Sequence, residues 1–420
     1  MNYYEESLSN NQGKNADQQI DNKIVKRHYP RNNNGQVLDF VFGKDPNLYL
    51  RKNKILIKGA IEIDDNYVTE NGFVAKLFGM LTVDVDSHTI SSNRAKGEYF
   101  LIDYIQKIGN FNCNTIETMF QLEGYHDFYN FDSKQLFEST KLISHRKLNG
   151  ILSGTKRIYE FMFIPNCGFL NSNMPLLNNC ELKLSFDRVN ADVSLLKGPV
   201  DPKAAISTDT VDSLAGKPIK IIDCYAITEY ISSEYHRNYF DRIDNQPIQY
   251  HFEECDITLT TLPINQTDIR LDNIRGGNSP TCLFLGIIPT NALNGDLSKS
   301  SVAFRHNNVK TVNITLNGKT VNGYPLEITN NSPVTVIQKH FDVTNRFMNP
   351  LASQCQTFSE FKSNWIYSHR FEAETTSQGW LGVHLELSEV FTIPYTLVIW
   401  SINTSAITID KFHQIEKVLL

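Results

Sequence analysis

The chain has 420 residues, enough for two domains of ordinary size or for one large domain. Hydrophobic residues make up 41% and charged residues 20%, which is the balance of a soluble globular protein and argues against a disordered chain. The net charge of −6 argues against a protein that wraps nucleic acid through a strongly basic surface. The 25 Phe and 18 Tyr, together with many β-branched residues, favour β-sheets.

The cysteines and the start of the sequence bear on the compartment. The 7 cysteines are scattered without a CxxC pair, which predicts free, mostly buried thiols in a reducing compartment. The first residues, MNYYEESLSNNQ, lack the basic-then-apolar pattern of a secretory signal. No apolar run approaches the ~18–20 residues that span a bilayer. We therefore expect a protein of the cytosol or nucleus that is not secreted and has no membrane span.

Residues 1–36 are polar and rich in Asn and Gln. Little in this segment can offset the entropy lost on folding, so we predict a flexible N-terminal arm. The arm is either a simple unstructured terminus or an assembly arm that orders against neighbouring subunits. The basic residues that are candidates for the second role are Lys23, Lys26, Arg27, His28 and Arg31.

Residues 37–196 form the first predicted domain, in which short β-type runs are separated by turn residues. In the run GMLTVDVDSHTI, Leu81, Val83 and Val85 alternate with polar residues, which predicts a half-buried strand. The run GEYFLIDYIQKIGN carries apolar residues at helical spacing and predicts a helix over 97–110. The runs RIYEFMFIP and CELKLSFDRV predict the last strands of this half.

A linker is predicted over 197–218, where Pro, Ser, Thr, Asp and small residues dominate. The second predicted domain, 219–420, is again rich in strand-like runs, such as IKIIDCYAITEYI, QYHFEECDITLTTLP, TCLFLGIIP and YTLVIWSINTSAITIDKF. Asn317 and Gly318 between two alternating runs predict a hairpin with a type I′ turn. Two β-rich halves around a linker predict two β-sandwiches in tandem, with short helices in the connections.

Three groups of residues imitate functional motifs. Gly318-Lys319-Thr320 resembles the end of a phosphate-binding loop, but it lies in a strand–turn–strand context and lacks the helix that such a loop needs. Asp84, Asp86 and His88 could ligate a metal from one strand face, as could the cluster His251, Glu253, Glu254 and Cys255. An alternating polar face on an exposed strand explains the first group equally well, and the second has no further cluster to complete a site.

No enzyme motif survives this comparison. The sequence has neither a GxSxG elbow nor an HExxH helix. A carbohydrate-binding surface would use exposed Trp, but the chain has 3 Trp. Two of them, Trp380 and Trp400, lie in apolar strand-like runs and are predicted to pack in the core. We therefore expect no catalytic, cofactor-binding or metal-binding residues.

Several segments in order resemble the double jelly-roll major capsid proteins of Polinton/Maverick elements and adintoviruses. The first half contributes DPNLYLRKNKILIKGAIEIDD, GMLTVDVDSHTISS, KGEYFLIDYIQKIGNF and GFLNSNMPLLNNCELKLSFDRVNADVSLL, and Tyr99 stands where the family has a helix-leading tyrosine. The second half contributes IKIIDCYAITEYISSEYH, SPTCLFLGIIPTNALNGDLSKS and YTLVIWSINTSAITIDKF. The resemblance spans about residues 37–412.

The resemblance implies an all-β protein with two jelly rolls in tandem and no enzymatic activity. It implies a homotrimer that forms a pseudo-hexagonal capsomer and assembles with neighbouring trimers into an icosahedral shell, with vertex or penton and minor capsid proteins as further partners. Encapsidated DNA would contact the inner face. The protein would then reside in a virion assembled in the host cytoplasm or nucleus. Two alternatives stay open: a minor capsid or vertex protein of related fold, and a β-sandwich carbohydrate-binding module or glycosidase.

Overall fold

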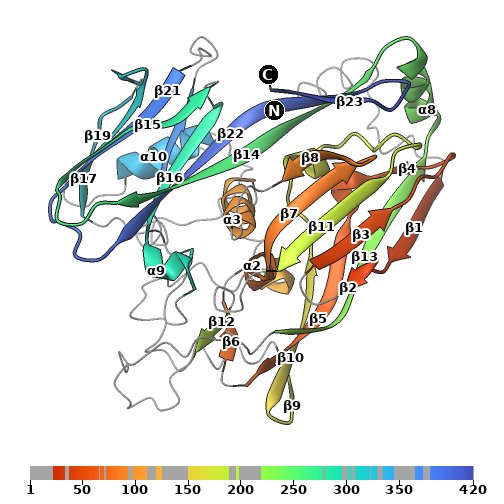
Figure 1. The fold of residues 1–420 in the computed structure, drawn as a ribbon, viewed down its shortest axis with the longest axis horizontal. Helices are drawn as coiled ribbons and strands as arrows, with labels where there is room; N and C mark the ends of the chain where they lie inside the picture. Colours follow the sequence, from red (N-terminus) through yellow and green to blue (C-terminus); the bar gives the residue numbers. More distant parts are fainter. Residues whose placement is uncertain are drawn as a thin grey trace.

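In the computed structural model, strands fold into two β-sandwiches whose paired strands run antiparallel (Figure 1). The structure describes residues 22–33, 37–65, 67–70, 72–92, 98–110, 120–124, 150–188, 195–197, 219–277, 280–295, 301–302, 304, 308–321, 323–328, 334–344, 365–371 and 379–419. The all-β prediction is confirmed.

Two sheets, named here after a central strand, form the first sandwich. The β5 sheet has the order β1 (Asn22–His28), β13 (Lys220–Ser232), β5 (Leu56–Asp64), β10 (Lys156–Phe163) and β9 (Ile151–Ser153), with β4 (Tyr49–Leu50) also on β13. The β7 sheet has the order β2 (Asn32–Asn33), β3 (Val37–Phe42), β11 (Leu182–Arg188), β7 (Phe78–Val85) and β8 (His88–Ser92). A short pair joins β12 (Leu195–Lys197) to β6 (Tyr67–Thr69).

Strands β1 and β13 correct two predicted boundaries. β13 follows the predicted linker and was assigned to a second domain starting at residue 219, but it pairs with β5 inside the first sandwich. β1 belongs to the segment predicted as a flexible arm, yet it pairs with β13 over its whole length, with Lys23 opposite Ile231. Local composition could not show either pairing because the partners lie about two hundred residues apart. Residues 1–21 and 198–218 lie outside the described residues.

Two further sheets form the second sandwich. The β22 sheet has the order β14 (Ile248–Leu262), β22 (Tyr395–Ile409), β16 (Cys282–Pro289) and β20 (Tyr367–Arg370), with β23 (Ile415–Leu419) also on β22. The β21 sheet has the order β15 (Asp268–Gly277), β21 (Gly379–Leu387), β17 (Val309–Leu316) and β18 (Lys319–Thr320), with β19 (Leu326–Glu327) on β17. The long β14–β22 pair crosses the molecule and reaches the first sandwich (Figure 1).

Short helices lie in the connections, as predicted. They are η2 (Lys52–Lys54), α2 (Phe73–Leu77), α3 (Tyr99–Asn110), η3 (Phe120–Glu123), α7 (Gly168–Asn171), α8 (Glu234–Phe240), η5 (Asp241–Asp244), α9 (Thr290–Leu293) and α10 (Val334–Val343). The predicted helix over 97–110 is α3, and it lies between the two sandwiches (Figure 1). Every residue from Tyr99 to Lys107 is buried, because both sandwiches pack against this helix.

The strand patterns follow from which faces are covered. In β7 the predicted alternation is confirmed, since Leu81, Val83 and Val85 are buried while the residues between them are half-buried. In β16, seven consecutive residues from Cys282 are buried. One face of this strand, with Leu283 and Leu285, belongs to the interior of the second sandwich. The other face, with Phe284, belongs to the core shared with the first sandwich.

Candidate assembly surfaces

Strand β1 carries four of the five basic residues predicted as an assembly arm, and it lies at the edge of the β5 sheet. Lys23 forms an ion pair with Glu229 at 2.5 Å, and Lys26 forms one with Asp45 at 2.9 Å. The hydrogen bond from Lys26 is the main reason that the pKa of Asp45 lies below its ordinary value. Both lysines therefore bind acidic groups of their own chain.

The other predicted arm residues also contact the first sandwich. The guanidinium of Arg27 lies over the ring of Tyr225, 4.3 Å from its centre. His28 Nε2 is 2.8 Å from Thr228 Oγ1, and burial, together with the charge of Lys26, lowers the pKa of its ring. The backbone N–H of Arg31 donates to the carbonyl of Asp39 at 2.8 Å. Lys23, Lys26, Arg27 and His28 thus lie along the β1 edge of the β5 sheet, whereas Arg31 contacts β3 of the β7 sheet.

Exposed apolar side chains occur on three strands of the β5 sheet. Val25 on β1 is 61% exposed and Ile222 on β13 is 46% exposed. Ile24 on β1, with Ile151 and Leu152 on β9, is also exposed. Strands β1 and β9 form the two edges of this sheet, so these residues are spread across its width. We call Ile24, Val25, Ile151, Leu152 and Ile222 together the β5-sheet patch.

A second group of exposed apolar residues lies at an end of the second sandwich. Ile264 follows β14, and Val390 and Ile393 lie in the connection from β21 to β22. The two connections are joined by a hydrogen bond from the backbone N–H of Asn265 to the carbonyl of Phe391. We call Ile264, Val390 and Ile393 the loop patch. Strand β1 and the β21 sheet, whose strands these connections flank, lie at opposite ends of the long axis (Figure 1).

Sequence reasoning missed the residues of both patches. In the connection LSEVFTIP, apolar residues stand among turn formers, and this mixture is the signal that could have indicated a covered loop. Ile222 lies in a β13 segment where a register shift beside β5 interrupts the alternation. Its outward position could not be read from a period-two pattern.

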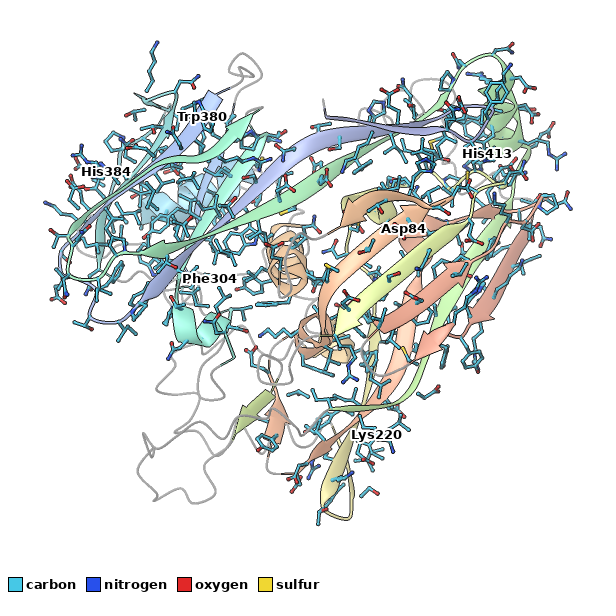
Figure 2. All side chains as sticks on the ribbon, in the orientation of Figure 1. Asp84, Lys220, Phe304, Trp380, His384 and His413 are labelled. Atoms are coloured by element: carbon cyan, nitrogen blue, oxygen red, sulfur yellow. The ribbon has the colours of Figure 1, made fainter. Side chains whose placement is uncertain are left out.

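Buried aromatic side chains lie in the interface between the two sandwiches. Trp400 of β22 is fully buried, and its indole N–H donates to the carbonyl of Leu101 in α3 at 3.0 Å. Phe304, labelled in Figure 2, packs edge-on against Trp400 and also contacts Tyr104 of α3. The predicted core position of Trp400 is confirmed. These contacts hold α3 against the β22 sheet.

Close backbone approach marks a second part of this interface, between α7 and β14. A Cβ atom on Gly168 would lie 1.7 Å from the carbonyl oxygen of Glu253, so only glycine fits. Next to it, the buried ammonium of Lys52 lies over the rings of Phe169 and Tyr250 and donates to the carbonyl of Met174. Burial lowers the pKa of Lys52 to about 7. Tight packing and buried polar contacts indicate that the two sandwiches form one unit.

The two groups that were considered as metal ligands, and set aside, are arranged differently in the structure. Asp86 lies in the turn between β7 and β8, with φ of 45°, so His88 begins the next strand and the group does not share one strand. Asp84 instead accepts a hydrogen bond from Thr89, and Asp86 faces Cys180 and His413.

The residues of the second group, along β14, differ in their exposure and contacts. His251 and Glu253 are exposed, whereas Cys255 is buried. Glu254 accepts hydrogen bonds from Lys417 at 2.7 Å and from Ser405. These residues support the strand and hold no common site.

The phosphate-loop imitation is a hairpin, as predicted. Asn317 and Gly318 have φ of 53° and 74°, the positive values that a type I′ turn requires, and Lys319 starts β18.

Trp380 corrects a prediction, because 57% of this side chain is exposed on β21. The apolar run around it gave no sign of this, since the β21 sheet has one covered and one open face.

Other predicted features concern the cysteines and the membrane. Cys167, Cys180, Cys224, Cys255 and Cys282 are free and buried, as predicted; the remaining two cysteines lie outside the described residues. None of the helices in the described ranges is long and apolar enough to cross a lipid bilayer.

Comparison with known proteins gives a result at the level of structure. No family model matches the sequence, and no curated protein matches it significantly. A chain of the cryo-EM structure of the Sputnik virophage superposes with a TM-score of 0.63 at 11% identity, covering 100% of this chain and 92% of that one.

The structures of two major capsid proteins are also similar to this chain. The mavirus major capsid protein has a TM-score of 0.51 at 11% identity, covering 94% of this chain and 90% of its own. The Faustovirus major capsid protein has a TM-score of 0.54 at 7% identity, covering 92% and 90%. The tandem sandwiches of this chain therefore have the double jelly-roll fold that is found in these viral capsid proteins.

Proposed function

We propose that this protein is a major capsid protein that trimerises into pseudo-hexagonal capsomers and assembles an icosahedral virus or virus-like shell. The observation that carries the proposal is the double jelly roll, which matches major capsid proteins over at least nine-tenths of both chains. Two tandem sandwiches also argue against a vertex protein, which needs one. The role is structural, and no enzymatic activity is proposed.

The two apolar patches support a ring of three subunits. A closed ring with rotational symmetry repeats one heterologous contact, so each subunit must offer two different surfaces. The β5-sheet patch lies on the first sandwich and the loop patch on the second, so they are different surfaces. We propose that the loop patch of one subunit covers the β5-sheet patch of the next.

The remaining parts of the proposal concern partners and location. The protein would reside in the virion after assembly in the host cytoplasm or nucleus, next to neighbouring trimers, vertex or penton proteins and minor capsid proteins. DNA on the inner face remains part of the proposal. Among the candidate assembly residues, Arg27 and Arg31 are exposed, which supports the proposal that they contact neighbouring subunits or the shell interior.

Solution mass and imaging test the proposal directly. The purified chain is expected to be a trimer by light scattering and to form hexagonal tiles or closed particles in electron micrographs. Ile222→Asp and Ile393→Asp each place a charge in one proposed contact, and each should convert the trimer to folded monomer. Val334→Asp, at a residue 56% exposed on α10, is the matched control and should remain trimeric.

Two outcomes would overturn the proposal. A chain that stays monomeric at all concentrations and forms no particles cannot build this shell. If that monomer binds glycans and loses the binding on Trp380→Ala, it is a carbohydrate-binding module, the alternative that the exposed Trp380 favours. If only the paired patches are wrong, Ile222→Asp and Ile393→Asp will remain trimers like the control.

A further inference from the structure

Asp86, Cys180 and His413 form a cluster of three different metal-ligand types where the two sandwiches meet. Their ligand atoms all lie within 4.8 Å of one another. His413 Nδ1 is 3.2 Å from Asp86 Oδ2 and 3.6 Å from Cys180 Sγ. Asp86 and Cys180 come from the first sandwich, whereas His413 comes from the turn between β22 and β23 (Figure 2).

Backbone geometry holds each of the three residues in place. The backbone N–H of Asp86 donates to the carbonyl of Glu181, which fixes the turn beside the residue that follows Cys180. His413 has φ of 60°, and its backbone N–H donates to the carbonyl of Asp410. The Asp410 carboxylate in turn accepts from the N–H groups on either side of His413. The cluster is thus preorganised by turns.

Two of the three separations match those around a tetrahedral zinc ion. Zinc binds His nitrogen and carboxylate oxygen at about 2.0–2.2 Å and thiolate sulfur at about 2.3 Å, which puts neighbouring ligand atoms roughly 3.2–3.8 Å apart. The two separations at His413 Nδ1 fall in this range. We propose that Asp86, Cys180 and His413 bind one zinc ion, with water as the fourth ligand.

The surroundings of Asp86 also suit a metal ligand. Its Oδ1 accepts from the backbone N–H of Glu181 at 2.9 Å and pairs with the Lys44 ammonium at 2.9 Å. Its Oδ2 faces His413. One oxygen is therefore held by outer groups while the other points at the cluster, which is how ligating carboxylates are commonly oriented. His413 is 32% exposed, so water and metal can enter from its side.

A catalytic cysteine–histidine–aspartate arrangement fits less well. Such an arrangement needs the carboxylate and the thiol on opposite ring nitrogens of the histidine, whereas here both contact Nδ1 of His413. Burial, with Asp86 beside it, raises the pKa of the Cys180 thiol, the opposite of what a nucleophile requires. Bound zinc would displace the thiol proton to solvent, because a coordinating thiol is deprotonated by the metal.

Zinc at this position would fasten the β22–β23 turn to the first sandwich. The test uses the full chain, stripped with chelator and dialysed against zinc chloride, with metal content measured by atomic emission. One zinc per chain is expected, together with a higher Tm for the zinc-loaded protein. Cobalt in place of zinc should give the thiolate-to-metal absorption of a sulfur ligand. His413→Ala and Cys180→Ala should each weaken binding at least about tenfold, the lower end of what loss of even an outer orienting group costs.

Matched controls separate this site from adventitious binding. His251→Ala, at an exposed histidine, and Cys224→Ala, at another buried cysteine, should retain the zinc and the Tm shift. Zinc content well below one per chain, or equal content in His413→Ala and the parent, would overturn the proposal. His413 is partly exposed, so its variant remains informative if Cys180→Ala fails to fold. None of these readouts depends on trimer or shell formation.

Discussion

The two halves of the molecule bury different kinds of polar side chain. Among the described residues, the buried Asp, Glu and Lys side chains all come from the part of the chain up to residue 229. They are Lys52, Glu70, Lys76, Asp103, Lys107, Glu123 and Glu229. The buried polar residues beyond it are Ser, Thr, Asn and His. Most of these charges lie on or next to the short helices that connect strands of the first sandwich.

The difference teaches how the two sandwiches are joined. Lys107 pairs with Asp103 at 2.6 Å and with Glu123, and Lys76 pairs with Glu70, which also accepts from Ser301. Buried ion pairs lose much of their attraction to desolvation, so they add little net stability, but a misplaced partner is costly. We infer that they select one docking of α3 and its neighbours, while apolar contacts such as those of Trp400 supply the stabilisation.

Removing Trp400 should have the largest effect. Trp400→Ala deletes a fully buried ring and leaves a cavity between α3 and the β22 sheet, which should lower the free energy of unfolding by about 3–5 kcal/mol. The free energy of unfolding is measured by urea unfolding followed by circular dichroism. Trp380→Ala, at the exposed tryptophan, should change it by less than about 0.5 kcal/mol. Equal losses in the two variants would contradict the assignment of the shared core.

The second-largest loss of stability is expected when the buried charge cluster of Lys107, Asp103 and Glu123 is broken. Lys107→Met leaves Asp103 and Glu123 without their cation and should cost about 3 kcal/mol at pH 8. Burial raises the pKa of Glu123 to about 7 in the folded protein, above its ordinary value, so protonation favours the folded state below that pH. The cost should therefore shrink toward pH 5.

The control for this variant is an exposed ion pair of the same type. Lys156 binds Glu62 at 2.6 Å on the β5 sheet, and its side chain is 54% exposed. Lys156→Met should change the free energy of unfolding by less than about 1 kcal/mol at either pH. If Lys107→Met changes the free energy of unfolding as little as this control does, the buried charge cluster does not select the docking of α3.

In the second sandwich, we expect His369 to make the free energy of unfolding depend on pH, with a smaller effect. Its ring packs against Phe371 at 4.6 Å and Tyr324 at 5.4 Å, and burial, with the charge of Lys339, lowers its pKa to about 4. The ring has an ordinary pKa near 6.5 in the unfolded chain. The neutral ring therefore stabilises the folded protein above pH 6.5, and this stabilisation is lost as the pH falls toward 4.

His369→Gln removes this titration. The parent should lose about 2 kcal/mol more than the variant between pH 7 and pH 4.5, less than the full shift implies because the ring keeps some solvent contact. Denaturant unfolding at the two pH values measures it, and His251→Gln, at an exposed histidine, should keep the parent's dependence. An identical loss in parent and His369→Gln would place the acid sensitivity elsewhere.

Much of the local structure could be predicted from the residues alone. The period-two pattern of β7, the helical spacing of α3 and the Asn317-Gly318 turn each depend on neighbours within a few residues, so the sequence carries them directly. The order of such segments also indicated two sandwiches. Asp86 was considered as a metal ligand together with Asp84 and His88, but its proposed partner His413 could not be found this way, because the two residues are separated by more than three hundred residues.

By itself, then, the sequence determined the strands, the main helix and the tandem arrangement, because these follow from local periodicity and turn chemistry. Only the tertiary structure decided which edges and faces are covered. It joined β1 and β13 to the first sandwich, buried both faces of β16, and left Trp380 open to solvent. The reason is physical: every strand edge offers the same backbone hydrogen bonds, so the choice of partner depends on packing between residues far apart in the chain.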